Sequence, residues 1–341
     1  MRVTRESLIR IAKETTQERA YNNKDIIAAY LTGSLATDAD PMLGGAADID
    51  LVFVHTFQPI HEREFVKLTS DFHVDIHHRA RAEFKSPREL RGDPWLGYEM
   101  FAPTLLFERE KFFDFVQAAL RAGFEFEGPT LTLQRSRKLM AESRKLWMPL
   151  NDINEDAGPQ DVKNYLDALF FIANAIAELS GPPIQERRLL LEFPARAEAA
   201  DHPGMTAALL GLLGANNLST DHLSAWLPGW RSAFEAACEN PNAEISINSI
   251  RLNYYEKAIK AMLESDSPQA ALWPLIHTWT LSALALPKEQ IKEWRTACES
   301  LGLVGKKFPE HIEGLDRFLD EVEIMLDEIA TANGLETSAT I

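Results

Sequence analysis

Cysteine is scarce in this chain, and its scarcity removes two common ways of stabilising a small domain. The 341 residues include only two cysteines, Cys238 and Cys298, which lie far apart and show no CxxC spacing. No cluster of histidines accompanies either of them. We therefore expect neither a disulfide framework nor a structural zinc site.

Long hydrophobic runs are also missing. The longest apolar stretches lie around residues 168–177 and 281–286, well short of the roughly 20 residues that span a bilayer. The N-terminal sequence Met-Arg-Val-Thr-Arg-Glu leads into an amphipathic pattern and lacks the apolar segment of a secretory signal. We therefore expect a cytoplasmic protein with no membrane partner.

Positive charge is in deficit. The chain has 35 Lys and Arg against 51 Asp and Glu, which gives a net charge of −16. Such a field repels polyphosphate backbones and attracts cations, so a nucleic acid partner is disfavoured and a cationic small molecule is favoured. An acidic surface that only keeps the protein soluble remains the alternative.

Alternating hydrophobicity marks the first third of the chain as a mixture of strands and helices. Residues 72–78 alternate apolar and polar side chains and predict a strand, and residues 63–68 fit its hairpin partner better than a helix. Residues 36–46 form a loop or short helix. The remaining segments are predicted as helices at 4–20, capped by Thr4, and 112–122, and as strands at 26–31, 47–55 and 104–109.

Beyond residue 128 the strand pattern disappears and helical spacing takes over. Helices are predicted at 130–148, 160–180, 184–193, 204–213, 221–239, 250–265, 274–285, 288–301 and 309–333. This change of period predicts an α+β chain. Its N-terminal domain, residues 1–128, would contain a mixed β-sheet with flanking helices, and residues 129–341 would form an all-α domain.

One segment between residues 31 and 54 carries the clearest chemical signal. It contains the pair Gly33-Ser34 and, after thirteen intervening residues, Asp48-Ile49-Asp50 at the head of an apolar run. Carboxylates at i and i+2 of a strand point to the same face. Two like charges side by side are unfavourable unless a cation lies between them. The spacing therefore predicts a site for a divalent metal.

A third carboxylate, Asp75, lies in the sequence His-Val-Asp-Ile-His. If the strands at 47–55 and 72–78 pair, Asp75 can face Asp48 and Asp50 across one pocket. Three carboxylates suit Mg²⁺, and two such ions could activate a hydroxyl and neutralise a leaving pyrophosphate. Gly33 permits close approach of the backbone, and Ser34 can donate hydrogen bonds to a terminal phosphate.

This pattern of strand, Gly-Ser, loop and Asp-apolar-Asp resembles the nucleotidyltransferase superfamily that includes DNA polymerase beta. A small catalytic domain followed by a larger helical domain is similar to the aminoglycoside nucleotidyltransferases. The motif covers residues 31–76, and over the helical half the resemblance is architectural only. The resemblance implies catalytic roles for Asp48, Asp50 and Asp75 as ligands of two Mg²⁺ ions, with Asp75 as metal ligand or general base, and triphosphate contacts from Gly33 and Ser34.

The expected activity is metal-dependent transfer of a nucleoside monophosphate from a nucleoside triphosphate. The acceptor would be a hydroxyl of a small cationic molecule, such as an aminoglycoside, bound by the helical domain. Two alternatives stay open. One is nucleotide transfer to tRNA or protein, as in toxin-like members, and the other is a non-catalytic nucleotide-binding regulatory protein.

Five other residues are weaker candidates. Arg187 and Arg188 could contact a triphosphate, but a surface arginine pair is favoured. Tyr165 could stack on a base or sugar, but packing is favoured. His73 and His77 could bind zinc, but the neighbouring carboxylates favour a harder cation, which leaves the histidines as polar strand residues.

Overall fold

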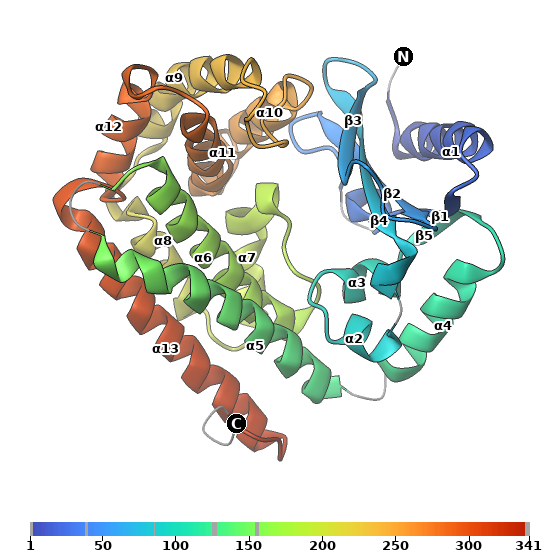
Figure 1. Cartoon of the computed structure of the whole chain (residues 1–341). Helices are drawn as coiled ribbons and strands as arrows, with labels where there is room; N and C mark the ends of the chain where they lie inside the picture. The colour runs from blue at the N-terminus through green and yellow to red at the C-terminus, as the bar shows by residue number, and fades with distance from the viewer. Residues whose placement is uncertain (1–2, 38–39, 85, 125–127, 154–156, 338–341) are drawn as a thin grey trace. The chain divides into compact units, whose positions relative to one another are not determined.

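The computed structural model describes residues 3–37, 40–84, 86–124, 128–153 and 157–337. The chain divides into two compact units, residues 1–128 and 129–341 (Figure 1). The division falls where the sequence changes from period two to helical spacing. Residues 38–39 of the predicted 36–46 loop lie outside the described residues.

The first unit is built on a mixed five-stranded sheet with the order β3-β4-β2-β1-β5. Strand β2 runs parallel to β4, and the other neighbouring strands are antiparallel. Strand β3 lies at an edge and pairs with β4, so the predicted hairpin is confirmed. The elements are α1 (Arg5–Asn22), β1 (Ile26–Leu31), η1 (Gly33–Leu35), β2 (Ala47–His55), β3 (Arg63–Lys67), β4 (Phe72–Ala80), η2 (Arg81–Phe84), α2 (Pro87–Arg91), α3 (Leu96–Phe101), β5 (Thr104–Glu108) and α4 (Phe112–Phe124).

Helices cover both faces of this sheet, which explains why β1 and β2 read as continuous apolar runs. On one face Ile49 and Leu51 of β2 pack with Leu8 of α1. On the other face Val52 of β2 packs with Met100 of α3 and with apolar residues of α2 and α4. In β2, Asp50 is the one residue that is not fully buried. Asp50 is on the same face of β2 as Val52, the face covered by α2, α3 and α4, and at Asp50 this apolar cover is incomplete.

The ends of the elements follow local chemistry. Thr4 accepts a hydrogen bond from the Ser7 amide, and the Ser7 side chain bonds back to Thr4, so the predicted helix start is confirmed. Helices α2 and α3 were not predicted from the sequence. Each is at most six residues long, which is too short to show a helical period.

The second unit is helical throughout its described part. Its α-helices are α5 (Gly128–Trp147), α6 (Pro159–Ala177), α7 (Leu189–Ala199), α8 (Gly204–Leu212), α9 (Thr220–Cys238), α10 (Leu252–Leu263), α11 (Leu272–Leu284), α12 (Lys292–Leu301) and α13 (Phe308–Ala332). Helix α11 lies at the centre, in contact with α6, α9, α10 and α12. It is buried almost all round, as expected for a helix with apolar residues on every face.

Charged pairs join helices that are distant in sequence. Arg144 on α5 donates to Asp320 and Glu323 on α13 at 3.1 and 2.9 Å. Arg135 on α5 donates to Glu178 at 3.0 Å, and both side chains are buried. Within the described ranges, no helix combines the length and the apolar character needed to cross a membrane.

Candidate metal centre

Three carboxylates converge on one face of the N-terminal sheet. Asp48 and Asp50 come from β2, and Asp75 comes from β4. The parallel register places Asp50 directly beside Asp75 and Asp48 beside His73. One oxygen from each aspartate lies within 4.8 Å of the others. The expected pairing of these two strands is confirmed, and with it the convergence of the three side chains.

Burial makes this cluster unfavourable without a cation. Asp48 is 6% exposed and Asp75 1%, while Asp50 is half-buried. Ionised carboxylates removed from water repel one another strongly unless positive charge compensates them. Their donor atoms are all oxygens, the ligands that Mg²⁺ and Mn²⁺ prefer. The chemistry of the donor set therefore fits a hard divalent ion.

Gly33 lies directly against this cluster. Its φ of +68° is in the left-handed region, and a Cβ built on it would lie 1.9 Å from Asp50 Oδ2. The Thr32 amide donates to the Asp50 carbonyl at 3.0 Å, which ties the turn to β2. Only glycine leaves room for the carboxylate here. The turn thus forms a cradle around Asp50, with Ser34 as the next residue, half-buried in η1.

Arg63 also belongs to this site, although its role was not predicted from the sequence. From the edge strand β3 its Nε donates to Asp75 Oδ1 at 2.8 Å, and its Nη2 donates to Oδ2 at 2.6 Å. The guanidinium also lies 5.0 Å from the centre of the Phe65 ring. This two-bond geometry is the strong form of an arginine–carboxylate pair. The predicted hairpin is the one sequence feature that could have identified Arg63, because it places residue 63 on the strand next to the strand of Asp75.

The histidines of β4 border the cluster but are not part of it. His77 Nε2 lies 3.5 Å from Asp75 Oδ1. Burial lowers the pKa of His77, and this outweighs the Asp75 carboxylate, which raises it. Among the described residues, the group with metal-binding geometry contains the three aspartates and neither His77 nor His73.

Further along the same face, another charged group sits beneath α3. Arg79 of β4 donates to Glu99 Oε2 at 3.0 Å, and the Tyr30 hydroxyl donates to Glu99 Oε1 at 2.5 Å. Burial raises the pKa of Tyr30 well above its ordinary value, with the Glu99 carboxylate adding to the effect. Here each charge has a fixed partner of opposite sign, so this group fixes α3 to the sheet.

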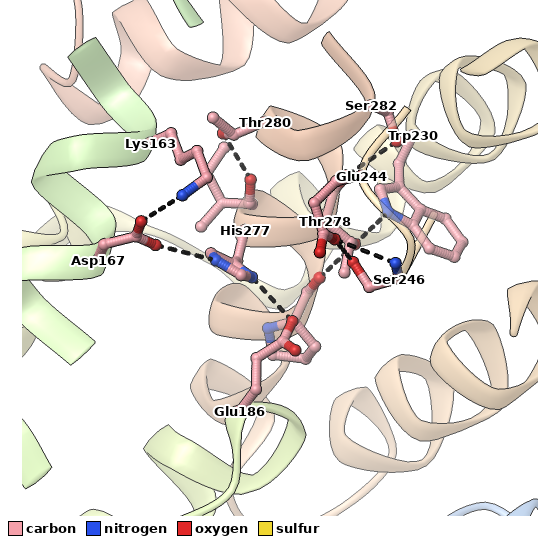
Figure 2. A network of polar contacts seen from close by, with 12 residues as sticks. Lys163, Asp167, Glu186, Trp230, Glu244, Ser246, His277, Thr278, Thr280 and Ser282 are labelled. Atoms are coloured by element: carbon pink, nitrogen blue, oxygen red, sulfur yellow. Dashed lines mark hydrogen bonds and ion pairs between the residues drawn. The ribbon is translucent and has the colours of Figure 1, made fainter. Parts of the chain in front are cut away.

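The helical unit holds a separate polar network (Figure 2). His277 of α11 lies between two carboxylates, with Nδ1 2.8 Å from Glu186 and Nε2 3.5 Å from Asp167. Lys163 pairs with Asp167 one helical turn away. Burial alone would lower the pKa of His277, but Glu186 and Asp167 together raise it to about 9. The imidazole is therefore a cation at neutral pH.

The weaker candidates in this unit, Tyr165, Arg187 and Arg188, differ in their surroundings. The Tyr165 hydroxyl donates to the Leu212 carbonyl at 2.9 Å from a fully buried ring, so the packing role is confirmed. Arg188 pairs with Glu192 on the next turn. The surface prediction is wrong for Arg187, which is 5% exposed and stacks at 3.5 Å over the Tyr254 ring. The stacking of a guanidinium on an aromatic ring that is distant in sequence cannot be predicted from neighbouring residues.

A cavity of about 560 Å³ opens between α7, α8 and α9 of the helical unit. Its walls are mostly apolar, with Asp266 and Gln269 among the polar residues that line it. None of the three aspartates of the metal centre lines this cavity.

No protein-family model matches this chain, and no curated protein sequence matches it significantly.

Proposed function

We propose that this protein is a metal-dependent nucleotidyltransferase. It would transfer a nucleoside monophosphate from a nucleoside triphosphate to a hydroxyl group and release pyrophosphate. The acceptor would be a small cationic molecule such as an aminoglycoside, a class that the net charge of −16 favours. The observation that carries the proposal is the buried aspartate triad with Gly33 against it.

Each part of the site supports a step of this chemistry. Asp48 and Asp50 would hold Mg²⁺ on the rigid strand β2, and Asp75 would complete the ligand set. Bound Mg²⁺ would supply positive charge for the triphosphate and for the leaving pyrophosphate. Asp75 would also accept the proton of the attacking hydroxyl once Arg63 no longer holds both of its oxygens. The Gly33 turn brings backbone close to Asp50, where the terminal phosphates would lie.

Calorimetry with ATP, GTP, CTP and UTP, each with and without Mg²⁺, is the direct test. We expect at least one nucleotide to bind only with Mg²⁺, and Asp48→Asn to abolish that binding. Glu14→Gln is the matched control, because it makes the same carboxylate-to-amide change at an exposed position on α1. The proposal is wrong if no nucleotide binds in a metal-dependent way, or if Asp48→Asn binds as the wild type does.

A positive result should be followed by pyrophosphate detection with a panel of acceptors. Turnover with a cationic polyol supports the proposed acceptor class, and turnover only with tRNA or a protein supports the first alternative. Metal-dependent binding without turnover of any acceptor supports a regulatory protein.

A further inference from the structure

The Arg63–Asp75 pair changes the charge balance of the metal centre. Both oxygens of Asp75 accept hydrogen bonds from the same guanidinium, at 2.8 and 2.6 Å. A carboxylate that accepts two such bonds is ionised, and arginine is always charged. The three aspartates carry three negative charges, and Arg63 cancels one of them. The charge of Asp75 is therefore already met by a cation of the chain itself.

The positive charge of Arg63 acts on the β4 side of the cluster, at Asp75. The hydrogen bonds from Arg63 go to Asp75 on β4, whereas Asp48 and Asp50 both lie on β2. The Asp75 oxygens that would face a second ion are the atoms that bind the guanidinium. A metal ion at Asp75 would share these oxygens with the guanidinium, and the like charges of the two cations repel one another.

Arg63 is held in this position by its own strand. Its guanidinium lies against the Phe65 ring, and β3 is hydrogen-bonded along β4. Because β3 is an edge strand, Arg63 is a side chain that can leave without opening the centre of the sheet.

We propose that Arg63 is an internal cation that takes the place of the second metal ion. The nucleotide-free chain then binds one divalent ion, at Asp48 and Asp50, while Arg63 occupies Asp75. This inference rests on the proposed function, because it assumes that the aspartates bind metal. It adds that Arg63 is a positioning residue that sets the number of ions, and that a second ion enters only when Arg63 leaves Asp75.

Titration of the full chain with Mn²⁺ alone tests this inference, with free Mn²⁺ followed by electron paramagnetic resonance. We expect about one bound ion for the wild type and about two for Arg63→Ala and Arg63→Gln. Arg63→Lys should keep about one ion, because it retains the charge. Arg19→Ala is the matched control and should also keep about one ion, since Arg19 pairs with Glu64 of the same strand at 3.0 Å.

The outcomes separate the two proposals. Wild type that binds no more Mn²⁺ than Asp48→Asn overturns the proposed function. A wild type that already binds two ions, or an unchanged number in Arg63→Ala and Arg63→Gln, overturns the role of Arg63 alone.

A second variant keeps the test decisive if Arg63→Ala does not fold. The double variant Arg63→Leu/Asp75→Leu replaces the whole pair by apolar side chains, a change that buried ion pairs often tolerate. We expect it to retain about one Mn²⁺, held by Asp48 and Asp50. Loss of that ion contradicts the assignment of the first site to β2.

Discussion

The two units of this protein each contain a cluster of ionisable side chains, and the clusters differ in how their charges are balanced. In the helical unit, the carboxylates of Asp167 and Glu186 face two cations, Lys163 and His277. In the described part of the N-terminal unit, three aspartates converge, and Arg63 pairs with Asp75. Paired charges stabilise packing by themselves, whereas converging carboxylates offer the oxygen ligands that a further cation would bind. The pairing of charges within each cluster thus distinguishes a structural network from a candidate binding site.

The largest effect should come from breaking a balanced pair in the helical unit. Glu178→Ala leaves Arg135 buried without its carboxylate, so we expect a loss of about 3–5 kcal/mol in the free energy of unfolding. Urea unfolding followed by circular dichroism measures it. Glu14→Ala, which removes an exposed carboxylate, should change stability by less than about 0.5 kcal/mol. A loss below about 1 kcal/mol in Glu178→Ala would show that water or other groups solvate Arg135.

The His277 cluster should give the helical unit a pH dependence. Because the folded-state pKa of His277 is raised to about 9, its stabilisation is complete below the unfolded value near 6.5. It is then lost as the pH rises through 9. The expected loss is about 3 kcal/mol. Denaturation of wild type and His277→Gln between pH 6 and 10 checks this.

In that series the His277→Gln curve should be flatter than the wild-type curve over the same interval. His222→Gln is the control, since His222 is exposed at the start of α9. Parallel curves for wild type and His277→Gln would refute the assigned cause.

Gly33→Ala tests the cradle at the unbalanced cluster. The new methyl group meets Asp50 Oδ2, and alanine is strained at a φ of +68°. We expect a loss of about 2 kcal/mol in stability together with loss of Mg²⁺-dependent nucleotide binding. Gly45→Ala separates the two effects, because Gly45 also has a positive φ but a Cβ added there would meet no atom within 4 Å. Equal loss of binding in both variants would show that strain, not contact with Asp50, is responsible.

The smallest effect should have the opposite sign. Asp50→Asn removes one of three mutually repelling charges, so the metal-free chain should gain about 1 kcal/mol in stability. At Mg²⁺ concentrations near one hundred times the dissociation constant, wild type should gain about 2.7 kcal/mol, and the variant should gain much less. Thermal unfolding with and without Mg²⁺ measures both. Destabilisation of metal-free Asp50→Asn would indicate that the triad is balanced without metal.

Much of the fold could be predicted because its signals are local. The alternation through Phe72, Val74 and Ile76 places these side chains on one face of a strand, and β4 has that course. The apolar run after Asp50 is continuous because both faces of β2 are covered. The short helices α2 and α3 escaped prediction because a helix of one or two turns shows no period.

The candidate site could be predicted only in part. Asp48 and Asp50 are neighbours on one strand, so period two alone places them together. Asp75 required the further assumption that two strands pair. Arg63 was missed because its role depends on register: it lies opposite His77 in the ladder and reaches Asp75 diagonally.

The sequence by itself determined the class of structure, its change from strands to helices and the shared face of Asp48 and Asp50, since all three follow from the chain's local periodicity. Only the tertiary structure decided which charges meet. His277 finds its two carboxylates on segments about ninety and more than one hundred residues away in sequence, and Gly33 meets Asp50 through a turn. These contacts depend on packing and register between distant segments, which local spacing does not encode.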